Sequence, residues 1–471
     1  MASSTAFGTT RESASIRRAL LLLCLVYATG MLCFQAFNYI YADIGQRIGT
    51  TPVLASMITA LPGSLLGIYC FIYGSLGDFV SLRKMAAVGF ALLFAGSVGG
   101  FLLNFDNVWL VVFWRAVQTA GGQIPGSVYL ILCTRFLEGK DRVKFFGLFN
   151  AVYAFASIVG ICCGGVLVSV GWTWLFLIPV VSVFCVPAIM AGVPEAGEGE
   201  RQRVDVPGFL LFAVGVALLT FFFGDYNPVV LAGAAVCFAV FAVYIHRAEN
   251  PFITPAFFKN SRWLCAISLL AVFYFYNHVI APTYGAMGAA VYGMSASQVS
   301  FFLVPAYVTW TVVACNSGVI YARLGRKRCA LLAAALLLTG FFSTAFCVAA
   351  GPAALTVLSC VIYGGFGLVY SPFFDTVVGT VDPDQSGRAV GMNDLAINVS
   401  ASIGVAVFTP MMAASPDAPA NLIGVSGAPA PYSTLFLAYG AIVLAGIVWY
   451  LLAYRRITTS HEPAPSELPL E

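Results

Sequence analysis

Long apolar runs, separated by short breaks of charged residues or of glycine and proline, follow one another along almost the whole chain. A helix needs about 20 mostly apolar residues to cross a bilayer. Runs of this length predict fourteen transmembrane helices, at residues 19–41, 54–76, 85–103, 108–134, 145–169, 172–192, 206–223, 228–246, 263–285, 298–321, 329–349, 353–377, 389–412 and 433–454. Only "GDYNP" at 224–228 separates the seventh and eighth runs, which together exceed one span and therefore predict a hairpin.

The composition supports this interpretation, since 60% of the residues are hydrophobic and only 9% are charged. A soluble domain could not bury so much apolar surface, so the fold class is an all-α integral membrane protein. The polar segment 1–18 and the length of the first apolar run predict that no signal peptide is removed. The 13 cysteines lie mostly singly within apolar runs, a pattern that favours packing over disulfides or a metal site.

The basic residues of the loops predict the orientation in the membrane. With the N-terminus in the cytoplasm, the predicted spans leave Arg47 outside and Arg115 within the membrane, and place every other Lys and Arg on the cytoplasmic side. Such a bias in short loops is typical of the cytoplasmic face. We therefore expect a multi-pass protein of the plasma membrane with both termini in the cytoplasm. The segment 413–432, rich in Pro, Ala and Gly, is expected to be an unstructured outer connection.

A polar motif, "YGSLGDFVSLRK" at 73–84, follows the second span, and a related one, "GVIYARLGRKR" at 318–328, follows the tenth. Glycines permit a tight turn there, and a carboxylate could pair with arginines of a neighbouring bundle in a contact that opens and closes. The candidate latch residues are Gly74, Gly77, Asp78, Arg83 and Lys84. Alternatively, both motifs are only cytoplasmic charge anchors. The second copy has Ala322 in place of the glycine–aspartate corner, which predicts an asymmetric latch.

The first motif resembles the G-x-L-x-D-x-x-G-R-K loop of the major facilitator superfamily. The segment "WRAVQTAGGQIPGSV" at 114–128 resembles the R-x-x-Q-G-x-G motif of the fourth helix in that family, and "VGICCGGVLVSVGWTWLFLIPV" at 159–180 resembles the antiporter motif of the fifth. The order of "RVDVPGFLLFAVG", "NPFITPAFFKN" and "GRAVGMND" after them is similar to that in fourteen-helix drug:proton antiporters. Among these, the tetracycline and multidrug exporters of Gram-positive bacteria are the most similar.

This resemblance implies two six-helix bundles at 19–192 and 263–454, a linker at 193–262 with two additional helices, and cytoplasmic tails at 1–18 and 455–471. It also implies export of hydrophobic or amphipathic compounds in exchange for protons by alternating access. The proton gradient would be the energy source without a cofactor, and the protein would be a monomer in the bilayer with no nucleic-acid partner. The chain shows no nucleophile–base set, metal-ligand cluster or phosphate-binding loop that would favour an enzyme. The alternative is a uniporter or a transporter of one metabolite without proton antiport.

The segment "VGICCGGV" departs from the antiporter motif, because Ile161 stands where the family has a proline. The bend that depends on that proline is therefore not expected. Gly160, Gly164 and Gly165 are retained, and small residues of this kind let two membrane helices approach closely.

Two polar residues of the fourth span are candidates for the substrate or proton pathway. Arg115 is the only basic residue predicted within the membrane, where a central arginine costs at least about 2.5–3.5 kcal/mol unless it faces a cavity or a partner. Gln118 follows at i+3, on the same face of the helix. By resemblance, this pair would organise the pathway; alternatively, Arg115 only ties its helix to a neighbouring backbone.

Asp394 is the only carboxylate predicted well inside the hydrocarbon, where its protonated form would be favoured and could carry a proton. Alternatively, it is interfacial at a helix N-terminus. The related exporters carry acids in the first span and later in the thirteenth, where this chain has Phe34 or Gln35 and Ala401. Asp394 precedes Ala401 by two turns on nearly the same face and could replace that carboxylate. Asp375, near the inner end of the twelfth span, is expected to be interfacial.

His278 lies in the ninth span within "FYFYNHVIAPTY" and titrates near neutrality, so it could relay protons or be an ordinary core residue. Aromatic side chains around it could line a pocket for a flat, partly cationic compound, or simply pack. These aromatic candidates are Tyr274, Tyr276, Tyr284, Tyr307 and Trp310. Gln35 and Asn38 of the first span complete the predicted pathway.

Overall fold

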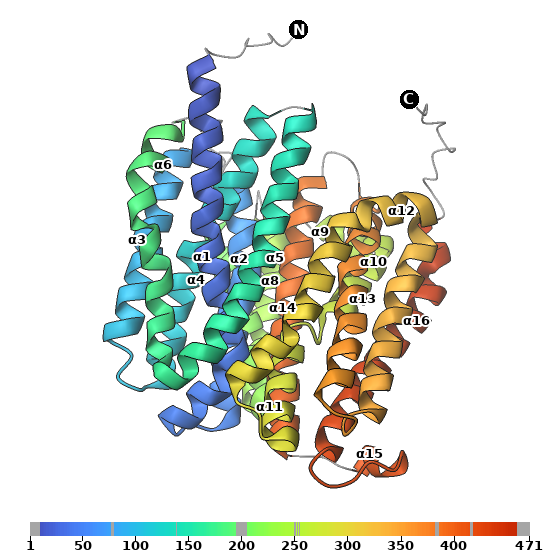
Figure 1. The fold of residues 1–471 in the computed structure, drawn as a ribbon. Helices are drawn as coiled ribbons and strands as arrows, with labels where there is room; N and C mark the ends of the chain where they lie inside the picture. The colour runs from blue at the N-terminus through green and yellow to red at the C-terminus, as the bar shows by residue number, and fades with distance from the viewer. Residues whose placement is uncertain are drawn as a thin grey trace.

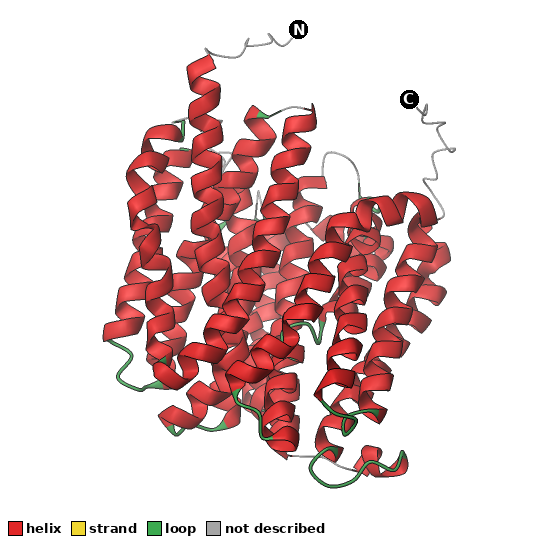
Figure 2. Cartoon of the chain, viewed as in Figure 1, coloured by secondary structure: helices red, strands yellow, loops and turns green. Residues whose placement is uncertain are grey.

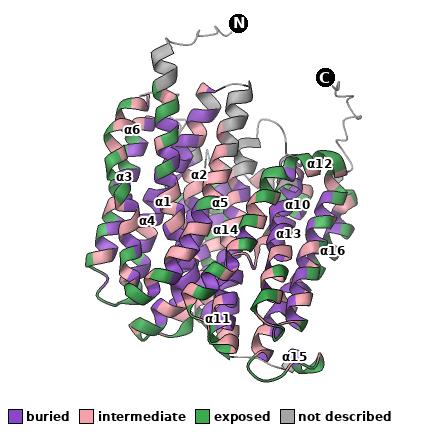
Figure 3. Cartoon of the chain, viewed as in Figure 1, coloured by how far each residue is buried: buried purple, intermediate pink, exposed green. Residues whose placement is uncertain are grey.

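The computed structural model describes residues 10–76, 80–137, 139–194, 205–248, 251, 253, 255–381, 386–414 and 418–458. All regular secondary structure in these ranges is helical, and the helices are joined by short turns (Figures 1 and 2). Helix α1 begins and α16 ends at the same end of the bundle (Figure 1). Buried residues gather where the helices lie against one another, and exposed residues lie mainly on the outer helix surfaces and in the loops (Figure 3).

The first half of the chain forms long helices at the predicted spans. They are α1 (Thr10–Ile48), α2 (Pro52–Leu76), α3 (Leu82–Leu102), α4 (Val108–Phe136), α5 (Gly139–Val170), the 3₁₀-helix η1 (Trp172–Cys185) and α6 (Val186–Gly192). The predicted sixth span at 172–192 thus begins as a 3₁₀-helix. Pro179 lies within η1 and cannot donate an i→i−4 hydrogen bond, a property that disfavours an α-helix at this point.

The predicted hairpin is present as α7 (Val206–Asp225) and α8 (Pro228–Arg247). Tyr226 ends α7 in the left-handed region, with φ 51°, and the Asn227 side chain caps α8 by accepting a hydrogen bond from the Val229 N–H at 3.0 Å. At the other end, the Asp205 carboxylate accepts from the Gly208 N–H at 2.9 Å and from the Tyr244 hydroxyl. One carboxylate therefore caps α7 and joins it to α8.

The second half contains α9 (Pro255–Lys259), α10 (Ser261–Tyr274), α11 (Ile280–Tyr292), α12 (Ala296–Phe346), α13 (Pro352–Val378), α14 (Ser386–Ala414), α15 (Ala418–Leu422) and α16 (Ala430–Thr458). The prediction of one continuous helix at 263–285 was wrong, since a turn between Tyr274 and Ile280 divides it into α10 and α11. The prediction that 413–432 is unstructured was also wrong, because this segment contains α15.

The 51-residue element α12 is two helices that meet at Gly325, whose dihedrals (φ 74°, ψ 168°) are not helical (Figure 1). A positive φ of this kind favours glycine, and the break falls between the predicted tenth and eleventh spans. Of the described helices, eleven are long and apolar enough to cross a bilayer when α12 is taken as one. Helix α4 and the divided segment α10–α11 are not among these eleven.

Three helices of the first half pack against the second half: α2 lies along α14, α5 along α12, and α1 against α11. Small residues bring these helices together. A Cβ atom on Gly67 of α2 would lie 3.0 Å from the Leu395 Cα of α14, and one on Gly165 of α5 would lie 2.5 Å from the Ser300 Oγ of α12. Gly160 and Gly164 lie against α1 instead, where a Cβ would be 2.4 and 2.9 Å from backbone carbonyl oxygens. The hairpin α7–α8 contacts the bundle through α7, which packs on α2 and α14.

Candidate functional site

Arg115 and Gln118 of α4 form the centre of a buried hydrogen-bonded cluster in the first half. Arg115 is 1% exposed, and its Nη1 donates to Gln118 Oε1 at 2.7 Å. Gln118 Nε2 in turn donates to Ser97 Oγ of α3 at 2.9 Å and to the Phe176 carbonyl of η1 at 3.1 Å. The spacing i, i+3 places both side chains on one face, so α4 is joined to α3 and η1 through Gln118.

The Arg115 guanidinium also lies on aromatic rings of α1. Its Cζ is 4.3 Å from the centroid of Phe37 and 5.8 Å from that of Phe34. A desolvated cation over a ring is worth up to about 2 kcal/mol, which offsets part of the burial cost. Nε and Nη2 nevertheless have no hydrogen-bond partner among the described residues. Arg115 therefore holds α1 and α4 together and still has donors available to another group.

A small cavity lies between the two halves. Its volume is about 10 Å³, whereas pockets for drug-sized ligands enclose about 300–1,000 Å³. It is lined by Gln35 and Asn38 of α1, Asn277 of the α10–α11 turn, Tyr307 and Trp310 of α12, and Tyr363 and Phe366 of α13. Amides thus face aromatic rings across the interface of the halves. This conformation would have to open before the cavity could admit such a ligand.

The cavity brings together four of the predicted residues, Gln35, Asn38, Tyr307 and Trp310. Tyr276 is not among the lining residues: it is fully buried and packs edge-on against Phe341, with ring centroids 4.9 Å apart. The sequence reasoning missed Asn277, Tyr363 and Phe366 as lining residues. Asn277 adjoins His278 in the aromatic segment, but nothing in the apolar pattern of α13 distinguishes Tyr363 from packing residues.

The turn between α10 and α11 connects His278 to the first half. Asn38 Nδ2 donates to the His278 carbonyl at 3.1 Å, and Thr59 Oγ1 of α2 donates to Asn38 Oδ1 at 2.8 Å. The His278 ring is 7% exposed and packs edge-on against Phe34, with centroids 5.7 Å apart. Its Nδ1 has no partner among the described residues. The backbone of His278, rather than its ring, therefore makes the polar contact with α1.

Asp394 lies eight residues after the first residue of α14, Ser386, so the alternative of a helix N-terminus does not hold. The dipole effect that would favour its charge acts only within the first turn. The Asp394 carbonyl accepts from Asn398 Nδ2 at 2.8 Å, while its half-buried carboxylate has no hydrogen bond or ion pair among the described residues. Asp394 and Arg115, the two charged pathway candidates, are not connected to each other by a hydrogen bond.

The latch residues of the first motif are only partly visible. Gly77 and Asp78 lie outside the described residues, and Gly74 is in the last turn of α2. Arg83 Nε donates to the Val193 carbonyl, beyond the end of α6, at 3.1 Å, and Lys84 is exposed. The predicted pairing of Asp78 with the other bundle therefore stays a prediction.

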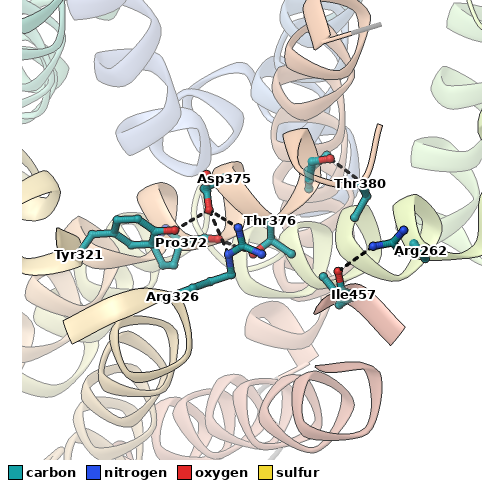
Figure 4. A network of polar contacts seen from close by, with 9 residues as sticks. Arg262, Tyr321, Arg326, Pro372, Asp375, Thr376, Thr380 and Ile457 are labelled. Atoms are coloured by element: carbon teal, nitrogen blue, oxygen red, sulfur yellow. Dashed lines mark hydrogen bonds and ion pairs between the residues drawn. The ribbon is translucent and has the colours of Figure 1, made fainter. Parts of the chain in front are cut away.

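The second motif obtains its carboxylate from a neighbouring helix (Figure 4). Arg326, directly after the break at Gly325, donates to Asp375 Oδ2 of α13 from Nη2 at 2.7 Å and from Nε at 3.0 Å. The Tyr321 hydroxyl donates to the same oxygen at 2.5 Å. Asp375, predicted to be interfacial, is half-exposed and joins α12 to α13 within the second half.

Nearby in Figure 4, Arg262 at the start of α10 donates from Nη2 to the Ile457 carbonyl near the end of α16, at 3.4 Å. Asn260 donates from Nδ2 to the Thr380 carbonyl at 2.8 Å. These contacts join α10, α13 and α16 at the end of the bundle where Asp375 lies, so the helices of the second half are tied together there.

Comparison with known proteins identifies relatives over most of the chain. The family model described as "Major Facilitator Superfamily" matches residues 23–405. The chain is 25% identical over 387 residues to "Multidrug resistance protein 3" of Bacillus subtilis, covering 79% of this chain and 74% of that protein. It is 26% identical to "Multidrug efflux pump SdrM" of Staphylococcus aureus (70% and 75% covered) and 24% identical to "Quinolone resistance protein NorB" of the same species (76% and 80%).

Among solved structures, a D-xylose-proton symporter superposes with a TM-score of 0.63 at 14% identity, covering 91% of this chain and 97% of that one. A POT family transporter in complex with 5-aminolevulinic acid gives 0.65 at 12% identity, covering 94% and 97%. At these identities the likeness shows the fold alone.

Proposed function

Because the chain belongs to the Major Facilitator Superfamily, we propose that it is a secondary active transporter that exports hydrophobic or amphipathic compounds in exchange for protons. Three relatives are named for multidrug resistance, multidrug efflux and quinolone resistance, and these names support a drug-like substrate. The motif resemblance adds tetracycline-like compounds to the candidates. The protein would act as a monomer in the plasma membrane, without a cofactor and without enzymatic activity.

The proposed architecture has fourteen spans with both termini in the cytoplasm. Each predicted span overlaps described helices when α12 is divided at Gly325 and when η1–α6 and α10–α11 are each counted as one crossing. An even number of spans agrees with the start of α1 and the end of α16 lying at one end of the bundle (Figure 1). The two bundles would be 19–192 and 263–454, with α7 and α8 in the linker between them.

The observation that carries proton coupling is the unpaired carboxylate of Asp394 between the two halves. An ionised carboxylate inside a membrane protein is costly unless it is paired or reaches water, so it is a natural place for a proton to bind and leave. The buried Arg115 cluster would shape the pathway beside it. Alternating access would then expose Asp394 to one side of the membrane at a time.

At the end of the bundle opposite the start of α1, two contacts between the halves would have to break when the protein opens to the outside. The Tyr39 hydroxyl of α1 donates to the Ala296 carbonyl of α12 at 2.8 Å, and the Tyr41 hydroxyl lies 2.6 Å from Thr409 Oγ1 of α14. With the N-terminus in the cytoplasm, these contacts close the outer side. Since the central cavity is also too small for a drug-sized ligand, we assign the conformation to a part of the cycle in which the outer side is closed.

Proton flux in proteoliposomes tests the proposal. A pH gradient is imposed, tetracyclines and cationic dyes are added in turn, and internal pH and substrate are recorded for wild type and Asp394→Asn. Proton movement that requires substrate and disappears in Asp394→Asn supports antiport through this carboxylate. The matched control is Asp43→Asn in α1, which removes a half-buried carboxylate elsewhere in the bundle and should preserve exchange.

Substrate movement without proton movement in wild type would overturn antiport and favour the alternative of a uniporter or metabolite transporter. One observation favours that alternative: the acid of the related exporters corresponds to Phe34 or Gln35, and Gln35 lines the central cavity as a neutral amide.

A further inference from the structure

The second half carries a group of exposed basic residues at the end of the bundle where α16 finishes. They belong to the break of α12 and to the last turn of α16, and they are Arg323, Lys327, Arg328, Arg455 and Arg456. The neighbouring Arg326 is already paired with Asp375. Arg328 and Arg456 have no ion pair within the part of the chain that the structure describes, so their charges are available to another group.

Contacts at both ends hold α16 beside the part of α12 that follows Gly325. At the basic end, Lys327 Nζ of α12 lies 4.9 Å from the centroid of the Tyr454 ring of α16, a cation–π contact. At the opposite end, Ser433 Oγ of α16 donates to the Ala345 carbonyl of α12 at 2.7 Å. The two helices are therefore antiparallel neighbours, and their basic residues lie next to each other.

Each of the two arginines without an ion pair continues an exposed apolar stripe of its own helix. On α16, Arg456 lies one turn beyond Leu452 and two turns beyond Val448, which are 70% and 49% exposed. On α12, Arg328 lies one turn before Leu332, which is 40% exposed. Residues i and i+4 share one face of a helix, so charge and apolar surface adjoin on both helices. In a bilayer, such stripes face the acyl chains.

We propose that Lys327, Arg328 and Arg456, here called the basic edge, bind the head group of an anionic phospholipid. The phosphate would accept hydrogen bonds from the guanidinium groups, whose planar donors match phosphate oxygens. The acyl chains would lie along the apolar stripes of α12 and α16. Basic residues between membrane helices are a recognised way to bind anionic head groups. A soluble anion would use the same cations but would leave the apolar stripes without a role.

This site goes beyond the proposed transport activity and does not depend on the identity of the substrate. In the proposed orientation the basic edge lies in the cytoplasmic leaflet, whose surface is negatively charged. Lys327 and Arg328 follow the break at Gly325 directly, so a bound lipid would fasten the break to the end of α16. The lipid would thus stabilise the second half beside the pair of Arg326 and Asp375.

Lipid binding to the delipidated full-length protein in an uncharged detergent tests the basic edge. Dioleoyl phosphatidylglycerol and dioleoyl phosphatidylcholine share their acyl chains and differ in net charge, and native mass spectrometry measures the affinity for each. Wild type should bind phosphatidylglycerol about tenfold more tightly, and added salt should reduce this preference. Arg328→Gln combined with Arg456→Gln should weaken phosphatidylglycerol binding by about tenfold to thirtyfold and leave phosphatidylcholine binding unchanged.

Two further double variants sharpen the result. Arg328→Lys combined with Arg456→Lys keeps both charges and should retain the preference for phosphatidylglycerol. The matched control, Arg18→Gln combined with Arg247→Gln, removes two exposed arginines of α1 and α8 on the cytoplasmic side of the proposed topology and should leave the affinity unchanged. A single symmetric size-exclusion peak shows that each variant is folded. Equal affinity in wild type and the Gln variant of the basic edge, or an equal loss in the control, would overturn the site.

A competition experiment distinguishes a lipid from a soluble anion. Inorganic phosphate and glycerol 3-phosphate carry the charge of the head group but have no acyl chains. At matched ionic strength they should displace no more phosphatidylglycerol from wild type than chloride does. Displacement by phosphate well beyond that by chloride would make the basic edge a site for soluble anions and overturn the assignment to a lipid.

Discussion

The two charged candidates of the membrane interior, Arg115 and Asp394, are in opposite environments. The guanidinium is 1% exposed, bonded to Gln118 and covered by the Phe37 ring. The carboxylate is half-buried, has no polar partner among the described residues, and belongs to α14, which packs against α2 of the first half. The guanidinium is fixed in one position by its hydrogen bonds and aromatic contacts. The carboxylate has no such partner, so it is free to bind and release a proton. This difference agrees with the proposed roles, in which Arg115 organises the pathway and Asp394 carries the exchange.

Replacement of Arg115 should have the largest effect. Arg115→Ala removes the cation that holds α1 on α4 and leaves Gln118 Oε1 with the weak Cys33 thiol donor at 3.3 Å. We expect transport to be abolished and the free energy of unfolding to fall by about 1–3 kcal/mol, the cost of a buried polar group that loses its partner. Transport per folded protein in proteoliposomes checks the loss of activity, and thermal unfolding in detergent checks the loss of stability. Normal turnover in Arg115→Ala would reduce this residue to a scaffold role.

Asp394→Asn should separate function from stability. Coupled exchange should be lost, whereas the free energy of unfolding should stay within about 1 kcal/mol of wild type, because no ion pair or hydrogen bond is broken. Thermal unfolding of both variants under the same conditions compares the loss of stability in Asp394→Asn with that in Arg115→Ala. A large loss of stability in Asp394→Asn would mean that its carboxylate has a structural partner, and the comparison between the two charges would then fail.

The sequence predicted the helices better than their interruptions, and the reasons are physical. About 20 consecutive apolar residues suffice to indicate a span, so the helices coincide with the predicted runs. The turn between α10 and α11 contains no glycine or proline, and it is stabilised by α1 and α14, through Asn38 Nδ2 on the His278 carbonyl and Ser400 Oγ on the Ala271 carbonyl. Partners more than a hundred residues away leave no local signal.

At the candidate site, too, the sequence indicates single residues but not their distant partners. A lone aspartate in an apolar run was enough to predict Asp394 as a membrane carboxylate. The close approach of α2 to it depends on Gly67, which is indistinguishable from a packing residue in its own run. Arg326 was predicted only as part of a basic loop, and its pairing with Asp375 depends on the break at Gly325.

Substitutions in the two polar motifs are expected to have effects of intermediate size. Asp78→Asn should impair transport with little loss of protein, because a latch between the halves needs the charge. Asp375→Asn breaks a pair within one half whose side chains are 30% and 46% exposed, so it should lower stability by at most about 1 kcal/mol. Transport activity and the amount of protein extracted in detergent are measured in parallel for Asp78→Asn and Asp375→Asn. Wild-type turnover in Asp78→Asn would contradict the latch, and equal impairment in both variants would mean that the two motifs act alike.

The smallest effect is expected at the connection before α16, where two sites in one loop can be compared. Gly424 and Gly427 adopt positive φ values of 79° and 72°, and the residues between them are largely exposed. A short Gly-Ser insertion after Ser426 should therefore preserve expression and transport, since loop tips of this kind tolerate insertions. The same insertion after Ala420, a fully buried residue of α15, should reduce protein levels because α15 packs on α16. Fluorescence-detection size exclusion of the two insertions measures the difference. Loss of folding at Ser426 would show that the whole connection, and not only α15, is part of the packed structure.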